Sequence, residues 1–218
     1  MHIEPGFVAP AKVAIANVTA MGVLGLYAKG FIKNPFDIVK MVLAAIFFSI
    51  FMQGFHMNVG PSELHFIGGM AIYLTLGFAP ALFGFAAGLL LQGLFFDPMD
   101  LQHLAVNSLS LILPLITVHY TAGRKLFDKS LGKRLSWKEI LKLDAIFYSG
   151  VTGMVGFWLF IGEVATPLSS WLTFASSYLA VVACEVPFTY MTVKLLKRYE
   201  DTPVVENCFE VGKLKLEV

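Results

Sequence analysis

Residues 65–96 read HFIGGMAIYLTLGFAPALFGFAAGLLLQGLFF, and this stretch contains no Asp, Glu, Lys or Arg. A transmembrane helix needs about 20 consecutive, mostly apolar residues. The stretch is longer than one such helix, and Gly77-Phe78-Ala79-Pro80 supplies turn-forming residues within it. It therefore predicts a hairpin of two membrane-spanning segments, of which the first is short.

The composition of the whole chain agrees with a membrane location. Of 218 residues, 57% are hydrophobic and only 14% are charged, whereas soluble domains contain about 25% charged residues. A soluble domain of this size could not bury so much apolar surface. The chain has only two cysteines, Cys184 and Cys208, far apart in sequence, which excludes a disulfide scaffold. A net charge of +1 gives no case for a nucleic-acid partner.

The apolar segments between charged and turn-forming residues predict an all-α, polytopic bundle of about seven transmembrane helices in the cell (inner or plasma) membrane. The predicted spans are Val8–Tyr27, Ile38–Phe55, His65–Phe78, Ala79–Phe96, Leu101–Thr121, Ala145–Ile161 and Leu168–Leu195. Residues 1–198 would form the membrane domain, and residues 199–218 a short cytoplasmic tail.

The distribution of Lys and Arg predicts the orientation. These residues occur in alternate loops, whereas the loops at 56–64, 97–100 and 162–167 contain none. The positive-inside rule then places the N-terminus outside and the C-terminus in the cytoplasm. Lys12, near the outer end of the first span, is the one exception and could snorkel to the interface. The other basic positions are Lys29, Lys33 and Lys40, then Arg124, Lys125, Lys129, Lys133, Arg134, Lys138 and Lys142, and finally Lys194, Lys197, Arg198, Lys213 and Lys215.

The first two residues, Met1 and His2, can form a metal chelate. The α-amine, the His2 backbone amide and the His2 imidazole would close a five-membered and a six-membered ring around one ion. Three nitrogens in one plane favour tetragonal ions such as Ni(II) or Cu(II). A histidine in second position can equally be incidental, but the apolar, turn-forming residues that follow would let the terminus fold back into the bundle.

Other polar residues lie near the predicted outer half of the spans, where ionisable groups are costly and often functional. His65 is the candidate fourth ligand, and His56 begins the same loop. His103 and Asn107 are four residues apart and share a helix face, so they could orient an imidazole or simply link helices. Glu185, deep in the last span, could be structural or part of a polar relay.

Several of these segments resemble one known family. Met1-His2-Ile3, His65-Phe66-Ile67-Gly68-Gly69, Gln92-Gly93-Leu94-Phe95-Phe96-Asp97 and Ala105-Val106-Asn107 resemble the CbiM/NikM family. Its members are the cobalt- or nickel-specific substrate (S) components of energy-coupling factor (ECF) transporters. The resemblance covers about the first 120 residues.

The resemblance implies a transported Co(II) or Ni(II) ion that is bound by Met1, His2 and His65, with Asn107 close to the metal. It also implies a membrane coupling (T) subunit and cytoplasmic ATPase (A) subunits as partners, and a small accessory membrane subunit is a further candidate. The S component does not hydrolyse ATP, and this chain contains no P-loop motif for binding a nucleotide. The family loop has its histidine two residues after a serine, whereas Ser62-Glu63-Leu64-His65 has it three residues after and brings a carboxylate close to the site.

Two other functions compete with metal capture. An intramembrane metalloenzyme could use His56, His65, His103 and Glu185, but no His-Glu-x-x-His motif is present. An S component for an organic vitamin would need a spacious, aromatic-lined pocket. We therefore expect a transport component rather than an enzyme.

Overall fold

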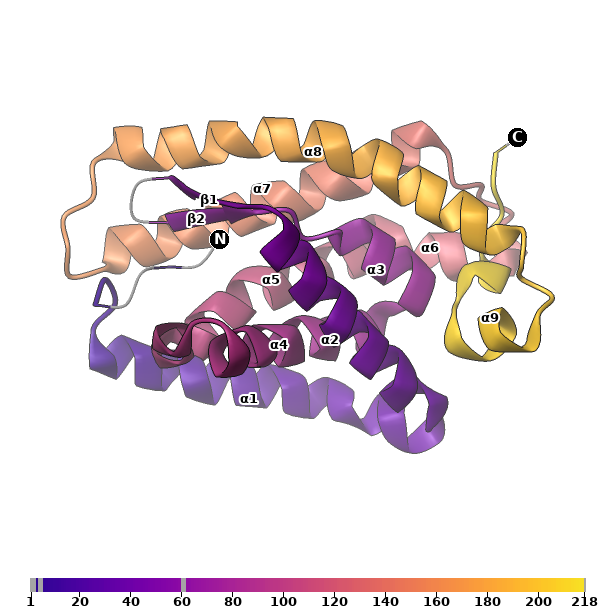
Figure 1. The fold of residues 1–218 in the computed structure, drawn as a ribbon, viewed down its shortest axis with the longest axis horizontal. Helices are drawn as coiled ribbons and strands as arrows, with labels where there is room; N and C mark the ends of the chain where they lie inside the picture. Colours follow the sequence, from indigo (N-terminus) through magenta and orange to yellow (C-terminus); the bar gives the residue numbers. More distant parts are fainter. Residues whose placement is uncertain (1–2, 4–5, 60–61, 218) are drawn as a thin grey trace.

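The computed structural model of the protein describes residue 3 and residues 6–59 and 62–217. Its long helices lie side by side in one elongated bundle (Figure 1). Within the described residues, six helical segments are long and apolar enough to cross a membrane. The protein is therefore an all-α, polytopic membrane protein, as the sequence predicted. The six segments are Pro10–Phe31, Phe36–Gly54, Phe78–Phe95, Pro98–Phe127, Trp137–Ile161 and Leu168–Lys197.

The first half of the described chain contains four helices and a hairpin. Its elements are α1 (Pro10–Lys33), α2 (Phe36–Gly54), β1 (His56–Val59), β2 (Ser62–His65), α3 (Gly69–Leu76) and α4 (Phe78–Phe95). The second half contains η1 (Pro98–His103), α5 (Leu104–Val118), η2 (His119–Gly123), α6 (Arg124–Phe127), η3 (Lys129–Leu131), α7 (Trp137–Ile161), α8 (Leu168–Lys197), α9 (Pro203–Cys208) and η4 (Val211–Lys213).

The third predicted span, His65–Phe78, differs from the structure. His65 ends strand β2, and only Gly69–Leu76 is helical, because Gly68 and Gly77 at the two ends adopt positive φ angles of 63° and 93°. All eight residues of α3 are buried inside the bundle. A non-helical backbone at membrane depth is tolerated where protein surrounds it, so a strand and a short helix can replace a full-length helix here.

The predicted loop at 56–64 contains an antiparallel hairpin that the sequence analysis did not predict. His56 pairs with His65 and Val59 pairs with Ser62. The hairpin lies in one half of the bundle, and α3 lies in the other (Figure 1). Ile3 extends this small sheet, since it forms an antiparallel bridge with Ser62.

Helix α7 begins eight residues before the predicted span Ala145–Ile161. The Ser136 side chain accepts a hydrogen bond from the Glu139 backbone N–H at 3.3 Å and caps a helix that starts at Trp137. Apolar content identifies only the part of a helix that can lie in lipid. The first two turns of α7, Trp137–Asp144, are more polar, so apolar content did not reveal them. Asp144, which the sequence analysis placed in a loop, is therefore fully buried in a helix.

Helices α2 and α4 pack closely through glycines. A Cβ atom at Gly84 would lie 2.3 Å from the Ala44 Cβ, and one at Gly88 would lie 2.5 Å from the Phe48 ring. By contrast, a Cβ at Gly22 on α1 would meet no atom within 4 Å. Small residues thus let two helices approach within the chain at the α2–α4 contact.

The segment after α8 packs against the end of the bundle. Val211 and Leu214 are buried, and the Glu210 backbone N–H donates to the Thr75 carbonyl oxygen at 2.6 Å. The Glu210 carboxylate also pairs with the side chains of Lys40 and Lys213. Burial raises the pKa of Glu210, but hydrogen bonds from Lys213 and Lys40 outweigh this effect and hold the pKa below its usual value.

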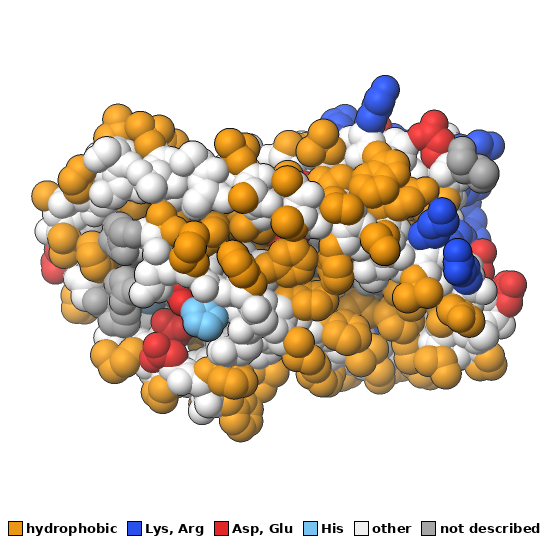
Figure 2. Space-filling model, turned by 45° about the horizontal axis from the view of Figure 1, so that its top comes forward, with side chains coloured by type: hydrophobic (Ala, Val, Ile, Leu, Met, Phe, Trp, Pro, Cys, Tyr) orange, Lys and Arg blue, Asp and Glu red, His pale blue; other side chains and the backbone are white. Residues whose placement is uncertain are grey.

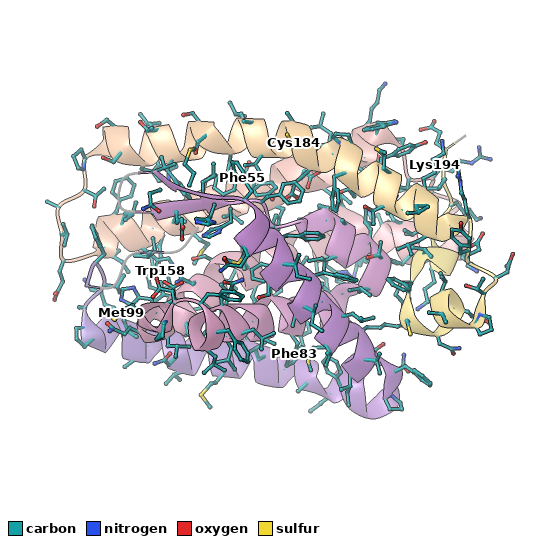
Figure 3. All side chains as sticks on the ribbon, in the orientation of Figure 1. Phe55, Phe83, Met99, Trp158, Cys184 and Lys194 are labelled. Carbon is teal, nitrogen blue, oxygen red and sulfur yellow. The ribbon has the colours of Figure 1, made fainter. Side chains whose placement is uncertain are left out.

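The basic side chains gather toward one end of the bundle. On the face shown in Figure 2, Lys and Arg lie at the end where α9 lies, a His lies toward the other end, and acidic side chains occur at both ends. Lys194 and Met99 belong to these opposite ends (Figure 3). This distribution is the one from which the positive-inside rule predicted a cytoplasmic α9 end.

Candidate metal centre

The backbone of Ile3 is fixed inside the bundle by three elements. Its side chain is fully buried, and it bridges to Ser62 of β2. Its N–H donates to the Asn107 Oδ1 atom at 3.0 Å, and its carbonyl oxygen lies 3.1 Å from the His103 Nδ1 atom. Because a carbonyl oxygen can only accept, Nδ1 of His103 carries the proton in this bond. Both backbone polar groups of Ile3 therefore have partners on one helix face.

His103 and Asn107 lie side by side, and both side chains contact the backbone of Ile3. His103 ends η1 and Asn107 lies in the first turn of α5, so both side chains point to the same side. They were candidates for orienting an imidazole, but in the structure they bind the main chain at Ile3. His103 also lines a cavity of about 360 Å³ that it shares with Asn17 of α1 and Glu163.

His65 is buried at the end of strand β2. Its Nδ1 atom lies 3.3 Å from the Met52 carbonyl oxygen, and its Nε2 atom lies 3.0 Å from the Glu63 Oε2 atom. With Nδ1 as the donor, a neutral imidazole keeps the Nε2 lone pair, which is the form that binds metals. The contact between Nε2 and the Glu63 carboxylate would favour an imidazolium ring, which carries a proton on Nε2 as well. A metal ion bound at Nε2 would displace the Nε2 proton.

Ser62, Glu63 and His56 lie around this histidine on the hairpin. The Ser62 Oγ atom is buried and has no hydrogen-bond partner within the described residues. The His56 side chain is exposed, and its ring centre lies 6.3 Å from that of His65. Glu63 is partly exposed. The hairpin thus presents two imidazoles, a hydroxyl and a carboxylate next to Ile3.

The loop after His65 is held by a residue whose role the sequence left open. The Glu185 Oε1 atom accepts hydrogen bonds from the backbone N–H groups of Ile67 at 3.0 Å and Gly68 at 2.8 Å, and from the Tyr148 hydroxyl. Glu185 is fully buried. It therefore connects α7 and α8 to the loop between β2 and α3.

The two remaining predicted ligands, Met1 and His2, lie outside the described residues. Within the described part of the chain, no three His, Cys, Asp or Glu residues are grouped so that they could hold a metal ion. The described donors near Ile3 include the buried imidazoles of His65 and His103 and the hydroxyl of Ser62. A complete metal site at this place would need donors beyond the described His, Cys, Asp and Glu residues.

The comparisons with known proteins agree on one family and one fold. The CbiM family, described as the cobalt uptake substrate-specific transmembrane region, matches residues 2–202. A crystal structure of a transition metal transporter is similar to this chain with a TM-score of 0.72 and 20% identity, over 94% of this chain and 96% of that chain. A crystal structure of a truncated transition metal transporter has a TM-score of 0.71 and 20% identity, over 91% of this chain and 99% of that chain.

No curated protein sequence matches the chain. The two structural likenesses show a common fold, and the family match covers nearly the entire sequence. The chain therefore belongs to the CbiM family and is a multi-pass membrane component of a metal transporter.

Proposed function

We propose that this protein captures Co(II) or Ni(II) from outside the cell as the S component of an ECF transporter. The ion would be held by the α-amine of Met1, the amide and imidazole of His2, and His65. The observation that carries the proposal is the position of Ile3, which is buried and bonded to Asn107 and His103. The residue that follows the proposed chelate is thus fixed inside the bundle.

The direction of the Ile3 bridge supports the involvement of His65. Ile3 and Ser62 form an antiparallel bridge. In an antiparallel pair, moving backwards along one strand means moving forwards along the other. If the antiparallel pairing continued beyond this bridge, the chain before Ile3 would run along β2 toward His65, and consecutive Cα atoms are only about 3.8 Å apart. A chelate at positions 1 and 2 would then be within reach of the buried imidazole.

Transport would require partners. The positive-inside rule puts the hairpin end outside, where it can take up the ion, and the α9 end in the cytoplasm. The chain contains no P-loop for binding ATP. We therefore propose that a membrane T subunit and two cytoplasmic A subunits supply coupling and ATP hydrolysis, and that the bound ion is cargo.

Calorimetric titration of Ni(II) and Co(II) into five proteins tests this function. Extension of a chain that starts at Met1 by one Gly should abolish binding as fully as His2→Ala, because the amine becomes an amide and the ring sizes change. His65→Ala should bind less tightly, since water can take the fourth position. His56→Ala, a change at the exposed partner of His65 in the hairpin, is the control and should bind like the wild type.

Tight binding by the extended protein would refute the chelate, provided that circular dichroism shows an intact helical fold. Equal losses in His56→Ala and His65→Ala would refute the assignment of the fourth ligand, because only the buried imidazole should contribute. A preference for one of the two ions would follow from the same titrations.

A further inference from the structure

Two carboxylic acids lie in the core between the hairpin end and the α9 end. Asp144 of α7 and Glu185 of α8 are both fully buried. Within the described residues, neither oxygen of Asp144 has a hydrogen-bond partner, and the Glu185 Oε2 atom also has none. Hydrogen bonds from the backbone and from Tyr148 satisfy only Glu185 Oε1.

The helical spacing brings a third unsatisfied group to the same place. Helices α7 and α8 are connected by the short segment 162–167 and run in opposite directions (Figure 1). The bond between Tyr148 and Glu185 puts these two residues at one level. Asp144 is one turn before Tyr148 and Thr189 is one turn after Glu185, so these two also share a level. Thr189 is fully buried, and its Oγ1 atom has no partner within the described residues.

The two acids have no basic partner. No Lys, Arg or His of the described chain lies within the 4.0 Å ion-pair distance of either carboxyl group. Among the described ionisable groups, Asp144 and Glu185 interact with each other, and Tyr148 of α7 and Tyr178 of α8 interact with Glu185. Two unpaired carboxylates inside a membrane protein cost several kcal/mol each. The cluster therefore requires a positive charge.

A proton fits this cluster better than a metal ion. Metal ions such as Ca²⁺ and Mg²⁺ need about six oxygen ligands or several waters, and the described cluster offers two carboxyl groups and a hydroxyl. A protonated carboxyl group gains an O–H donor. That donor could satisfy one of the free oxygen atoms in the cluster. We propose that Asp144, Glu185 and Thr189 form an internal proton-binding site between α7 and α8.

The site lies directly behind the loop that follows His65, because Glu185 is bonded to Ile67 and Gly68 in that loop. One bound proton lowers the net charge of the two carboxyl groups from −2 to −1 in this part of the membrane-embedded core. It also leaves Glu185 Oε1 available to accept the two backbone N–H groups. The proposal concerns the metal-free protein and does not depend on the chelate at Met1 and His2.

Infrared difference spectroscopy on the full-length, metal-free protein in lipid nanodiscs tests the site. The wild type at neutral pH should show the carbonyl stretch of a buried, protonated carboxylic acid. Asp144→Asn should remove this band or shift it. The control Glu206→Gln changes an exposed acid on α9 and should leave the band unchanged. Labelling Asp carboxyl groups with ¹³C in the wild type should shift the band without any mutation.

Three results would overturn the proposal. The first is the absence of a protonated carboxyl band at neutral pH in the wild type. The second is a band that neither Asp144→Asn nor the Asp label changes. The third is loss of the band when sodium chloride replaces choline chloride at constant pH, because the site would then bind Na⁺. The labelled wild type decides the question even if the variant does not fold.

Discussion

Replacement of Asn107 by Ala should weaken metal binding by disconnecting Ile3 from α5. The Asn107 Oδ1 atom accepts the Ile3 N–H at 3.0 Å in a fully buried position. After the replacement, that N–H has no acceptor, and an unsatisfied buried donor costs about 1–3 kcal/mol. At about 1.4 kcal/mol per factor of ten, this free energy corresponds to a loss of affinity of about 5- to 140-fold.

The size of the loss depends on when the bond forms. If Ile3 docks on α5 only in the metal-bound state, the full cost appears in the dissociation constant. If Ile3 is docked with and without metal, the cost appears in the free energy of unfolding instead. Titration of Ni(II) and Co(II), combined with thermal unfolding of the metal-free protein, separates the two cases. The estimate of 140-fold is therefore an upper bound.

Two variants on the same helix are controls. Asn107→Asp keeps an oxygen acceptor for the Ile3 N–H and should bind metal more tightly than Asn107→Ala. Ser110→Ala removes the acceptor of the Trp158 indole N–H at 3.1 Å, a buried bond that does not involve Ile3. It should lower stability and leave affinity unchanged. The reasoning is refuted if Ser110→Ala and Asn107→Ala weaken metal binding equally.

Three further predictions concern orientation, packing and pH. In a cysteine-free background, Met99→Cys should react with an impermeant thiol reagent on intact cells and Leu131→Cys should not; the reverse pattern would invert the proposed topology. Gly84→Ala should destabilise the protein in thermal unfolding by about 1–3 kcal/mol through overpacking, whereas Gly22→Ala should not, and equal effects would contradict the close α2–α4 contact. Because its folded-state pKa is lowered, Glu210 contributes stability above its unfolded-state pKa and loses it as the pH falls through the folded value. Glu210→Gln should therefore lower the melting temperature at pH 7 and have little effect well below the usual Glu pKa of about 4.3; a pH-independent effect would argue against the ion pairs.

The sequence was sufficient for the membrane class and for most of the helices. Long apolar segments without charges can satisfy their backbone in lipid only as helices or barrels, so composition and segment length identify them directly. The ends of helices were harder to predict. The polar start of α7 has no apolar signal, and this is why Asp144 was assigned to a loop. A capping serine at 136, three residues before Glu139, was the available signal for the earlier start.

The hairpin and the short helix α3 could not be predicted from apolar content. A stretch such as 65–76 is equally apolar in a lipid-facing helix and in a segment buried among other helices. The contacts that distinguish the two cases come from Glu185, which is more than 100 residues away in the sequence. The same limit applies to the site. The spacing of His103 and Asn107 predicted a common face, but only the structure shows that this face binds Ile3.

The contacts of Ile3 also help to explain how the hairpin is held. Strand β2 has β1 on one side, and because Ser62, Leu64 and His65 are buried, unpaired backbone groups on its other side would be shielded from water. The Ile3 bridge covers that side at Ser62, and Asn107 and His103 satisfy the polar groups of Ile3 itself. Ile3 therefore completes one side of the hairpin, directly after the proposed ligands Met1 and His2. Metal binding, which would hold the segment in place, should then also stabilise the hairpin and the loop that Glu185 fixes. Slower amide exchange at residues 62–68 on addition of Ni(II) would show this coupling, and unchanged exchange would mean that the segment is docked regardless of the ion.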